Sequence, residues 1–399
     1  MNLLNSKISN PDIYVYVEEF NKKKKTVLID FFDSNYYQVF TNEMGIEYNL
    51  DSPTMVMLNG YRYNIKEDTI YKINLDVIDF LRNNINLISQ NENSFLIGFT
   101  INVENIETKI FGSSISVKKL DGYFNRYIDL SKFTFDIKGK LKVIIRNVGH
   151  GNWNEILSND EVKIVFDAGA SLNESKSNIR KIIDNRNIEY NNAKPILILS
   201  HWDKDHYHAL LGMTDSELRN NFSAFICRSN KPNLTSRKLF SRIENALGIA
   251  KTYPISANVK NSKRGVVLFK NINPITDQIV LYNAEEHKDR NISGLVLSVK
   301  SKNNSVILSG DCHYGQISRD ILPHLNFKHQ HHLVVPHHGG NAGKYIYEIP
   351  KNAIPGRAII SSGKNSYGHP LTKNIDSLKS NRYIVEQTIR TNNDIIIQL

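Results

Sequence analysis

The chain has 399 residues, 40% of them hydrophobic and 23% charged, which is the composition of a folded protein and excludes a largely disordered one. No stretch approaches the roughly 20 consecutive apolar residues of a membrane-spanning helix, and the first residues lack the apolar core of a secretory signal. Two cysteines, Cys227 and Cys312, are too few for a disulfide framework. We therefore expect a cytoplasmic protein without membrane contact. The formal net charge of +10 favours a polyanionic partner, although the charge is spread along the chain.

Short apolar and aromatic runs separated by polar turns dominate residues 1–138 and predict a β-rich N-terminal domain. The four lysines at 22–25 are explained either by a solvated hairpin turn or by a contact with nucleic acid. The role of this domain is unknown, and a protein partner for it stays open. Strands are predicted at 13–20, 26–32, 35–40, 94–103 and 108–117, and a helix at 75–85.

From residue 139 to residue 399, apolar strands alternate with helical segments, which indicates an α/β sandwich as a second domain. Gly248 and Pro323 supply stops for two of the predicted helices. The predicted helices cover 178–187, 235–247, 316–322 and 372–379.

Side chains of the kind that bind metals follow the apolar run ILIL, within the segment LILSHWDKDH. Strand alternation brings residues two apart to the same side, and a tight turn can fold the next two onto the same centre. Mixed imidazole and carboxylate groups suit divalent transition metals. The four candidate ligands are His201, Asp203, Asp205 and His206.

Two further apolar strands end on similar residues. VILSGD ends on Asp311, and LVVPHHGG contains His337 and His338. Taken singly, Asp311 is equally well explained as a turn or helix-cap carboxylate, and either histidine as a core side chain. Sites in α/β proteins gather at strand ends, so three such endings together favour one shared centre.

The ordered motifs VGHG, FDAG, SHWDKDH, LSGD, PHHG and SYGHP resemble the metallo-β-lactamase fold, and within it the ComEC-type branch, the cytoplasmic hydrolase domain attached to bacterial DNA-uptake channels. The resemblance runs from about residue 141 to residue 370. It implies an αββα sandwich, here in a stand-alone relative without the membrane channel.

The resemblance also implies a pair of divalent ions, zinc or manganese, with a hydroxide held between them as the nucleophile. Asp203 stands where most of the family has a histidine, and the third protein ligand of the first ion has no clear match. The first ion would use His201 and Asp203, the second Asp205, His206 and His337, and Asp311 would bridge the two.

Further residues take roles from the same resemblance. Asp205 and Asp311 are candidates for orienting the attacking water, and His369 in SYGHP is a candidate for contacting phosphate or donating a proton, the alternative being a turn before Pro370. Asp167 and Gly169 in FDAG are expected to shape the site rather than to take part in its chemistry. The candidate substrate contacts are His150, His208 and His338. His150 stands where the family has Gln. A loop role for His150 and a helix-start role for His208 are open alternatives.

These features together predict a metal-dependent hydrolase, most plausibly a phosphodiesterase or nuclease acting on DNA or RNA. The basic charge supports this substrate class, because a basic surface attracts backbone phosphates. A hydrolase for a small molecule, such as a lactone, thioester or cyclic nucleotide, is the first alternative, since one fold serves many substrates. A non-catalytic binding protein with an incomplete metal site is the second.

Overall fold

The computed structural model describes residues 12–107, 109–115, 137, 139–259, 266–325, 329–343, 354–365 and 367–399. The chain divides into two compact units. The N-terminal unit comprises Met1–Tyr123 and Pro232–Lys238, and the C-terminal unit comprises Phe124–Lys231 and Leu239–Leu399. This division falls somewhat before the predicted boundary at 138, and the return of a short later segment to the N-terminal unit was not predicted.

One mixed seven-stranded sheet forms the centre of the N-terminal unit. The lysines at 22–25 are exposed and lie in the turn between β1 and β2, as the hairpin interpretation predicted. Helix α2 (Leu75–Asn83) confirms the predicted helix. In sheet order the strands are β5 (Ile88–Gln90), β6 (Ile97–Asn102), β3 (Met55–Asn59), β2 (Thr26–Phe31), β1 (Ile13–Asn21), β4 (Thr69–Ile73) and β7 (Phe111–Ile115).

The strand predicted at 35–40 is wrong, because these residues belong to helix α1 (Ser34–Met44). Asp33 caps the helix by accepting hydrogen bonds from the backbone of the first turn, and Gly45 ends it in the left-handed conformation. The buried residues Tyr37, Phe40, Thr41 and Met44 recur at helical spacing.

The segment Pro232–Lys238 belongs to the N-terminal unit through buried polar contacts. Asp30 is fully buried and accepts hydrogen bonds from the backbone N–H of Thr235 at 2.8 Å and from the hydroxyl of Thr54 at 3.0 Å. Leu234 joins the apolar core of this unit. The carboxylate of Asp30 thus satisfies an otherwise unpaired donor at the start of helix α6 (Leu234–Leu247).

The C-terminal unit contains two seven-stranded sheets. In order, the first consists of β13 (Thr252–Ile255), β12 (Ala224–Arg228), β11 (Ile196–Ile198), β10 (Glu161–Ala168), β9 (Trp153–Ser158), β8 (Leu141–Ile145) and β21 (Ile395–Gln398). The second consists of β14 (Phe269–Thr276), β15 (Ile279–Ala284), β16 (Leu295–Lys300), β17 (Asn304–Leu308), β18 (Gln330–Val334), β19 (Ile354–Ile360) and β20 (Ile384–Gln387).

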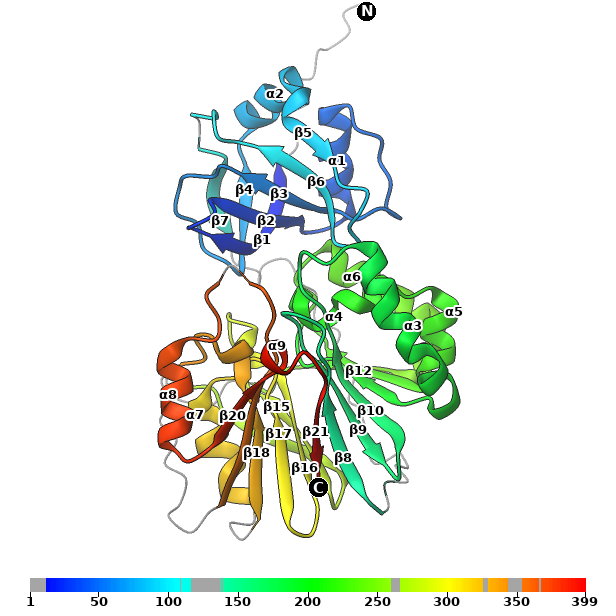
Figure 1. The fold of residues 1–399 in the computed structure, drawn as a ribbon. Coiled ribbons are helices and arrows are strands. Elements are labelled where there is room, and N and C mark those ends of the chain that lie inside the picture. Colours follow the sequence, from blue (N-terminus) through cyan, green and yellow to red (C-terminus); the bar gives the residue numbers. More distant parts are fainter. Residues whose placement is uncertain are drawn as a thin grey trace, which may run out of the picture. The chain divides into compact units, whose positions relative to one another are not determined.

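The two sheets of the C-terminal unit face each other, and helices cover their outer faces (Figure 1). A single apolar cluster contains side chains from both sheets, among them Ile198 and Phe166 from one and Leu308 and Val334 from the other. The predicted αββα sandwich is therefore confirmed. Helices α3 (Lys176–Ala193), α4 (Lys204–Leu211), α5 (Asp215–Asn221) and the body of α6 cover the first sheet; α7 (Tyr314–Gln316) and α8 (Thr372–Ser380) cover the second.

The predicted helices of this unit agree with the structure except in one segment. Residues 316–322 are divided among the end of α7, a π-helical turn at Ile317–Ile321 and a 3-10 turn at Leu322–His324. Strands β17 and β18 are parallel neighbours, so their carboxyl ends meet at one edge of the sheet. That edge carries Asp311 and the Pro336–Gly339 turn.

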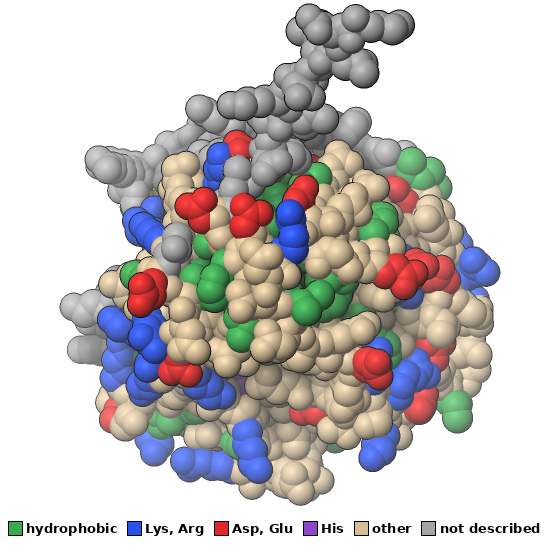
Figure 2. All heavy atoms as spheres, turned by 90° about the horizontal axis from the view of Figure 1, so that it is seen from above, with side chains coloured by type: hydrophobic (Ala, Val, Ile, Leu, Met, Phe, Trp, Pro, Cys, Tyr) green, Lys and Arg blue, Asp and Glu red, His purple; other side chains and the backbone are tan. Residues whose placement is uncertain are grey.

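Among the described residues, no helix combines the length and the apolar character that crossing a membrane requires. On the face shown in Figure 2, Lys and Arg side chains are interspersed with Asp and Glu side chains. The net charge therefore does not form a continuous basic field on that face.

Candidate metal centre

The loop after β11 is held by a buried carboxylate on the neighbouring strand β10. Asp167 accepts hydrogen bonds from the backbone N–H of Ser200 at 2.7 Å, from the Ser200 hydroxyl at 2.9 Å and from Asn152 at 3.1 Å. It also accepts the Nδ1–H of His206 at 2.8 Å. A Cβ on Gly169 would lie 1.7 Å from the carbonyl oxygen of Asp205, so the glycine permits this close approach. The geometric roles predicted for Asp167 and Gly169 agree with these contacts.

Asp311 meets two histidines of this loop. Its Oδ1 lies 3.1 Å from Nε2 of His206, and its Oδ2 lies 3.8 Å from Nε2 of His201. One ligand atom from each of the three residues falls within 4.8 Å of the others, and all three side chains are buried. Segments that are more than 100 residues apart in the sequence are thus brought together, as the strand-end argument predicted.

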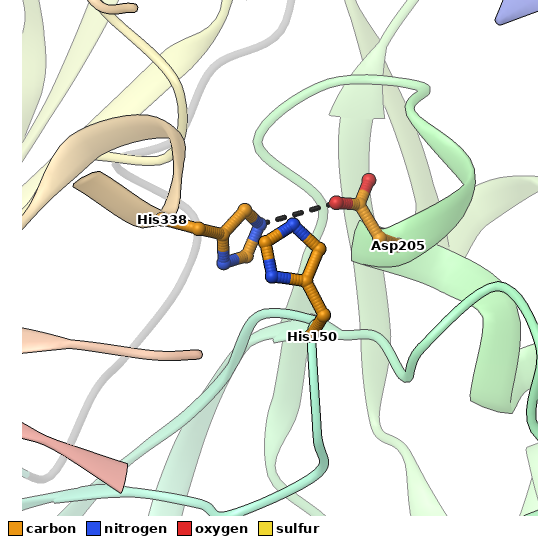
Figure 3. A group of neighbouring side chains, drawn as sticks. All are labelled: His150, Asp205 and His338. Carbon is orange, nitrogen blue, oxygen red and sulfur yellow. Dashed lines mark ion pairs between the residues drawn. The ribbon is translucent and has the colours of Figure 1, made fainter. Parts of the chain in front are cut away.

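A second group consists of His150, Asp205 and His338, whose ligand atoms also lie within 4.8 Å of one another. Figure 3 shows the three side chains converging from three different segments. Nε2 of His338 lies 3.1 Å from Oδ2 of Asp205. The two groups adjoin, because the ring centroids of His206 and His338 are 5.7 Å apart.

His337 and His338 contact different carboxylates. His338, expected to contact substrate, lies beside Asp205, whereas His337, expected as a ligand with Asp205, donates Nδ1–H to Oδ2 of Asp311 at 2.9 Å. Both residues have left-handed backbones, with φ of 52° and 51°. Such conformations persist where surrounding structure enforces them, and this turn fixes which ring points to which carboxylate.

Asp203 has two partners. Its Oδ2 lies 3.3 Å from Nε2 of His201, and its Oδ1 contacts the guanidinium of Arg290. Burial raises the pKa of Asp203, but Arg290 and His201 outweigh burial and leave that pKa below its ordinary value. Arg290 was not predicted, since a lone arginine in a loop carries no sequence signal.

The donor set fits a metal ion. The Nε2 atoms of His201, His206 and His338 are buried and form no hydrogen bond with a described residue. In His206 and His338 the other ring nitrogen donates, to Asp167 and to the carbonyl of Ser361 at 2.7 Å, so in the neutral ring Nε2 carries a lone pair that faces a carboxylate. Two acceptors in contact need a proton or a metal cation between them. Histidines oriented in this way are typical of metal sites.

The buried carboxylates raise the pKa values of the histidines that face them. Burial lowers the pKa of His206, yet Asp311 and Asp167 raise it well above its ordinary value. For His337, burial lowers the pKa but Asp311 raises it to about 9. Burial would raise the pKa of Asp311, but His206 and His337 hold it well below its usual range. An ion that binds here must displace a proton.

His369 and His208 lie outside the two groups. The ring of His369 is 5.2 Å from that of His337, and burial, with His337, lowers its pKa to about 4. A Cβ on Gly340 would lie 2.3 Å from Cε1 of His369, so Gly340 permits this position. His208 is fully buried in α4, and its Nδ1–H donates to the carbonyl of Ser171 at 2.9 Å. No described contact places His208 against the metal-type residues.

Comparison with known proteins finds no matching family model and no matching curated protein. Among solved structures, the chain is similar to the metallo-β-lactamase fold protein YhfI from Bacillus subtilis, at 12% identity and a TM-score of 0.37 over 65% of this chain and 100% of that one. It is also similar to Zn²⁺-bound PqqB from Methylobacterium extorquens, at 10% identity and a TM-score of 0.36, over 65% of this chain and 100% of that chain. For the short form of human tRNase Z the values are 11% and 0.30, over 48% and 76% of the two chains. At such low identity the function has to be argued from this chain's own side chains.

Proposed function

We propose that the C-terminal unit is a metal-dependent phosphodiesterase, with DNA or RNA as its substrate. The observation that carries the proposal is the convergence of His201, His206 and Asp311 with the adjoining Asp205 and His338. Two neighbouring sets of imidazole and carboxylate ligands suit a pair of divalent transition metal ions. Asp203 in SHWDKDH supports the finer assignment to the ComEC-type branch.

When bound, the two ions would lower the pKa of a water molecule and neutralise charge on the reacting phosphoryl oxygens. Asp311 contacts both His201 and His206 and is positioned to orient the attacking water with Asp205. His369, neutral at pH 7 because burial lowers its pKa, is suited to donate an N–H hydrogen bond to a phosphoryl or leaving oxygen. The fixed Nδ1 partners of His206 and His338 keep their Nε2 lone pairs directed at the centre.

The choice of nucleic acid rests on the net charge of +10, which attracts a polyanion. On the face that Figure 2 shows, basic side chains are interspersed with acidic ones. A compact ester or cyclic nucleotide is therefore the alternative substrate that the experiment has to separate.

A labelled single-stranded oligonucleotide incubated with Mn²⁺ or Zn²⁺ tests the proposal. We expect cleavage that requires the added metal and falls steeply with salt concentration. The control is the double variant Asp205→Ala, His206→Ala, and cleavage by this protein at the wild-type rate would refute the proposal. Salt-insensitive turnover of a lactone, thioester or cyclic nucleotide would favour the small-molecule reading, and protein that retains no metal would favour a binding role.

A further inference from the structure

His150 lies on the loop between β8 and β9, in the motif VGHG. Its side chain is buried, and one ring nitrogen lies within 4.8 Å of a carboxylate oxygen of Asp205 and of a ring nitrogen of His338 (Figure 3). The ring centroids of His150 and His338 are 4.4 Å apart. A second imidazole thus lies beside the Asp205–His338 pair.

In the neutral form of His338, the two atoms of this pair that face each other are both acceptors. His338 donates Nδ1–H to the carbonyl of Ser361, so the nitrogen that faces Oδ2 of Asp205 at 3.1 Å is the one without that proton. A carboxylate oxygen and an imidazole lone pair at this distance repel each other unless a cation or a proton lies between them.

His150 contributes a third potential ligand. One of its ring nitrogens lies within 4.8 Å of the ligand atoms of Asp205 and His338, and its Nδ1 is buried without a hydrogen bond to any described residue. Leaving a buried polar atom unsatisfied costs about 1–3 kcal/mol, which a bound ligand would recover.

The backbone holds this ring in place. The backbone N–H of His150 donates to the hydroxyl of Ser171 at 2.5 Å. A Cβ on Gly363 would lie 2.4 Å from the backbone nitrogen of His150, so Gly363 allows the two loops to touch. The ring also stacks on Tyr367 at 5.5 Å. A histidine fixed by three segments is suited to a ligand role, which needs a precise position.

We propose that His150 is a metal ligand and forms, with Asp205 and His338, a three-residue site for one divalent transition metal ion. The proposal rests on the proposed function, of whose two ions it describes one. His201, His206 and Asp311 are then the core of the other site. Two imidazoles and one carboxylate leave positions open for water or substrate, as in catalytic zinc sites and non-haem iron sites, and they disfavour Mg²⁺ and Ca²⁺.

The site differs from what the sequence resemblance implies. That resemblance gives the second ion Asp205, His206 and His337, and it has Gln where this chain has His150. In the structure, His206 and His337 are directed at Asp311 instead. The imidazole of His150 therefore supplies a nitrogen ligand where the resemblance predicts a substrate contact.

The test replaces His150 by cysteine and loads the full-length protein with Co²⁺. A thiolate bound to Co²⁺ gives an intense charge-transfer absorption in the near ultraviolet, which we expect in His150→Cys and which is independent of activity. The matched control is His332→Cys, another buried histidine, which lies in the middle of β18, belongs to neither metal-type group and accepts the backbone N–H of Arg357 at its Nδ1. Wild-type protein gives the baseline for the buried Cys227 and Cys312.

Zn²⁺ titration of His150→Gln, monitored by competition with a chromophoric chelator, provides the second measurement. We expect wild type to bind two equivalents and the variant to bind one of them at least tenfold more weakly, with unchanged far-ultraviolet circular dichroism. No charge-transfer band in His150→Cys, or two equivalents of unchanged affinity in His150→Gln, would overturn the proposal. Oligonucleotide cleavage together with either result leaves the proposed function standing, whereas a band in a protein without phosphodiesterase activity refutes only that function.

Discussion

The substitution Asp167→Asn tests whether the metal centre depends on the buried carboxylate behind it. One oxygen of Asp167 accepts the backbone N–H of Ser200, and the other accepts from Ser200 Oγ, His206 Nδ1 and Asn152 Nδ2. An asparagine amide replaces one of these acceptors with a donor, so at least one N–H or O–H then faces another donor. His206 loses the contact that keeps its proton on Nδ1 and its lone pair on Nε2.

The expected effect is a tenfold to hundredfold loss in metal affinity, the range seen when partners behind a metal ligand are removed. This corresponds to about 1.4–2.7 kcal/mol. Because the carboxylate is fully buried and accepts four hydrogen bonds, we also expect the free energy of unfolding to fall by about 1–3 kcal/mol. Competition with a chromophoric chelator measures the first quantity, and denaturant unfolding the second.

Asp30→Asn is the matched control for this experiment. Asp30 is equally buried and accepts hydrogen bonds from Thr235, Thr54 and Phe31, but it belongs to the N-terminal unit. We expect it to lower stability without changing metal affinity. If Asp167→Asn binds Zn²⁺ within twofold of wild type, or if both variants weaken binding equally, the inferred role of Asp167 is refuted.

Three further outcomes follow from the structure. Arg180 donates two hydrogen bonds to Glu217, at 2.7 and 3.0 Å, and they lower the pKa of Glu217 from 4.5 to about 2. Glu217→Gln should therefore lower the free energy of unfolding by about 1–2 kcal/mol above pH 4.5, and by progressively less as the pH falls towards 2. A difference in unfolding free energy that does not depend on pH would contradict this. Because the pKa of His206 is raised, apparent Zn²⁺ affinity should increase with pH, by up to tenfold per unit for each proton released, and a flat profile between pH 6 and 8 would argue against it. Gly340→Ala should displace His369 and His337, whose ring atoms would lie 2.3 and 2.6 Å from the added Cβ, and lower turnover by about 100-fold while metal content stays unchanged; loss of the metal would assign Gly340 to the centre instead.

Hydrophobic periodicity predicted most of the fold. It failed in a short segment whose apolar residues fit both the spacing of a strand and that of a helix. In residues 35–40, adjacent aromatic residues favour a strand by propensity. Only the wider spacing from Tyr37 to Met44, with Asp33 and Gly45 as caps, indicates a helix. The return of Pro232–Lys238 to the N-terminal unit depends on a hydrogen bond between Asp30 and Thr235, which local sequence cannot specify.

The sequence predicted those parts of the candidate site that lie at the ends of strands. The loop bearing His201 and His206 does meet Asp311, because β11 and β17 both end at the site. It was not predictable that His338 would face Asp205, because two successive left-handed residues decide which ring does so. Alternation along a strand says nothing about side-chain directions in such a turn.

The charges at the centre indicate why two ions suit an anionic substrate better than one. Asp167, Asp203, Asp205 and Asp311 supply four carboxylates, and Arg290 supplies one guanidinium, in contact with Asp203. With His337 protonated, as its pKa of about 9 implies, and the other histidines neutral, these groups carry two net negative charges, which one divalent ion only neutralises. A second divalent ion turns the balance to two positive charges, and the centre then attracts a phosphodiester. In the proposed three-residue site, His150 beside Asp205 would give that second ion an additional nitrogen ligand.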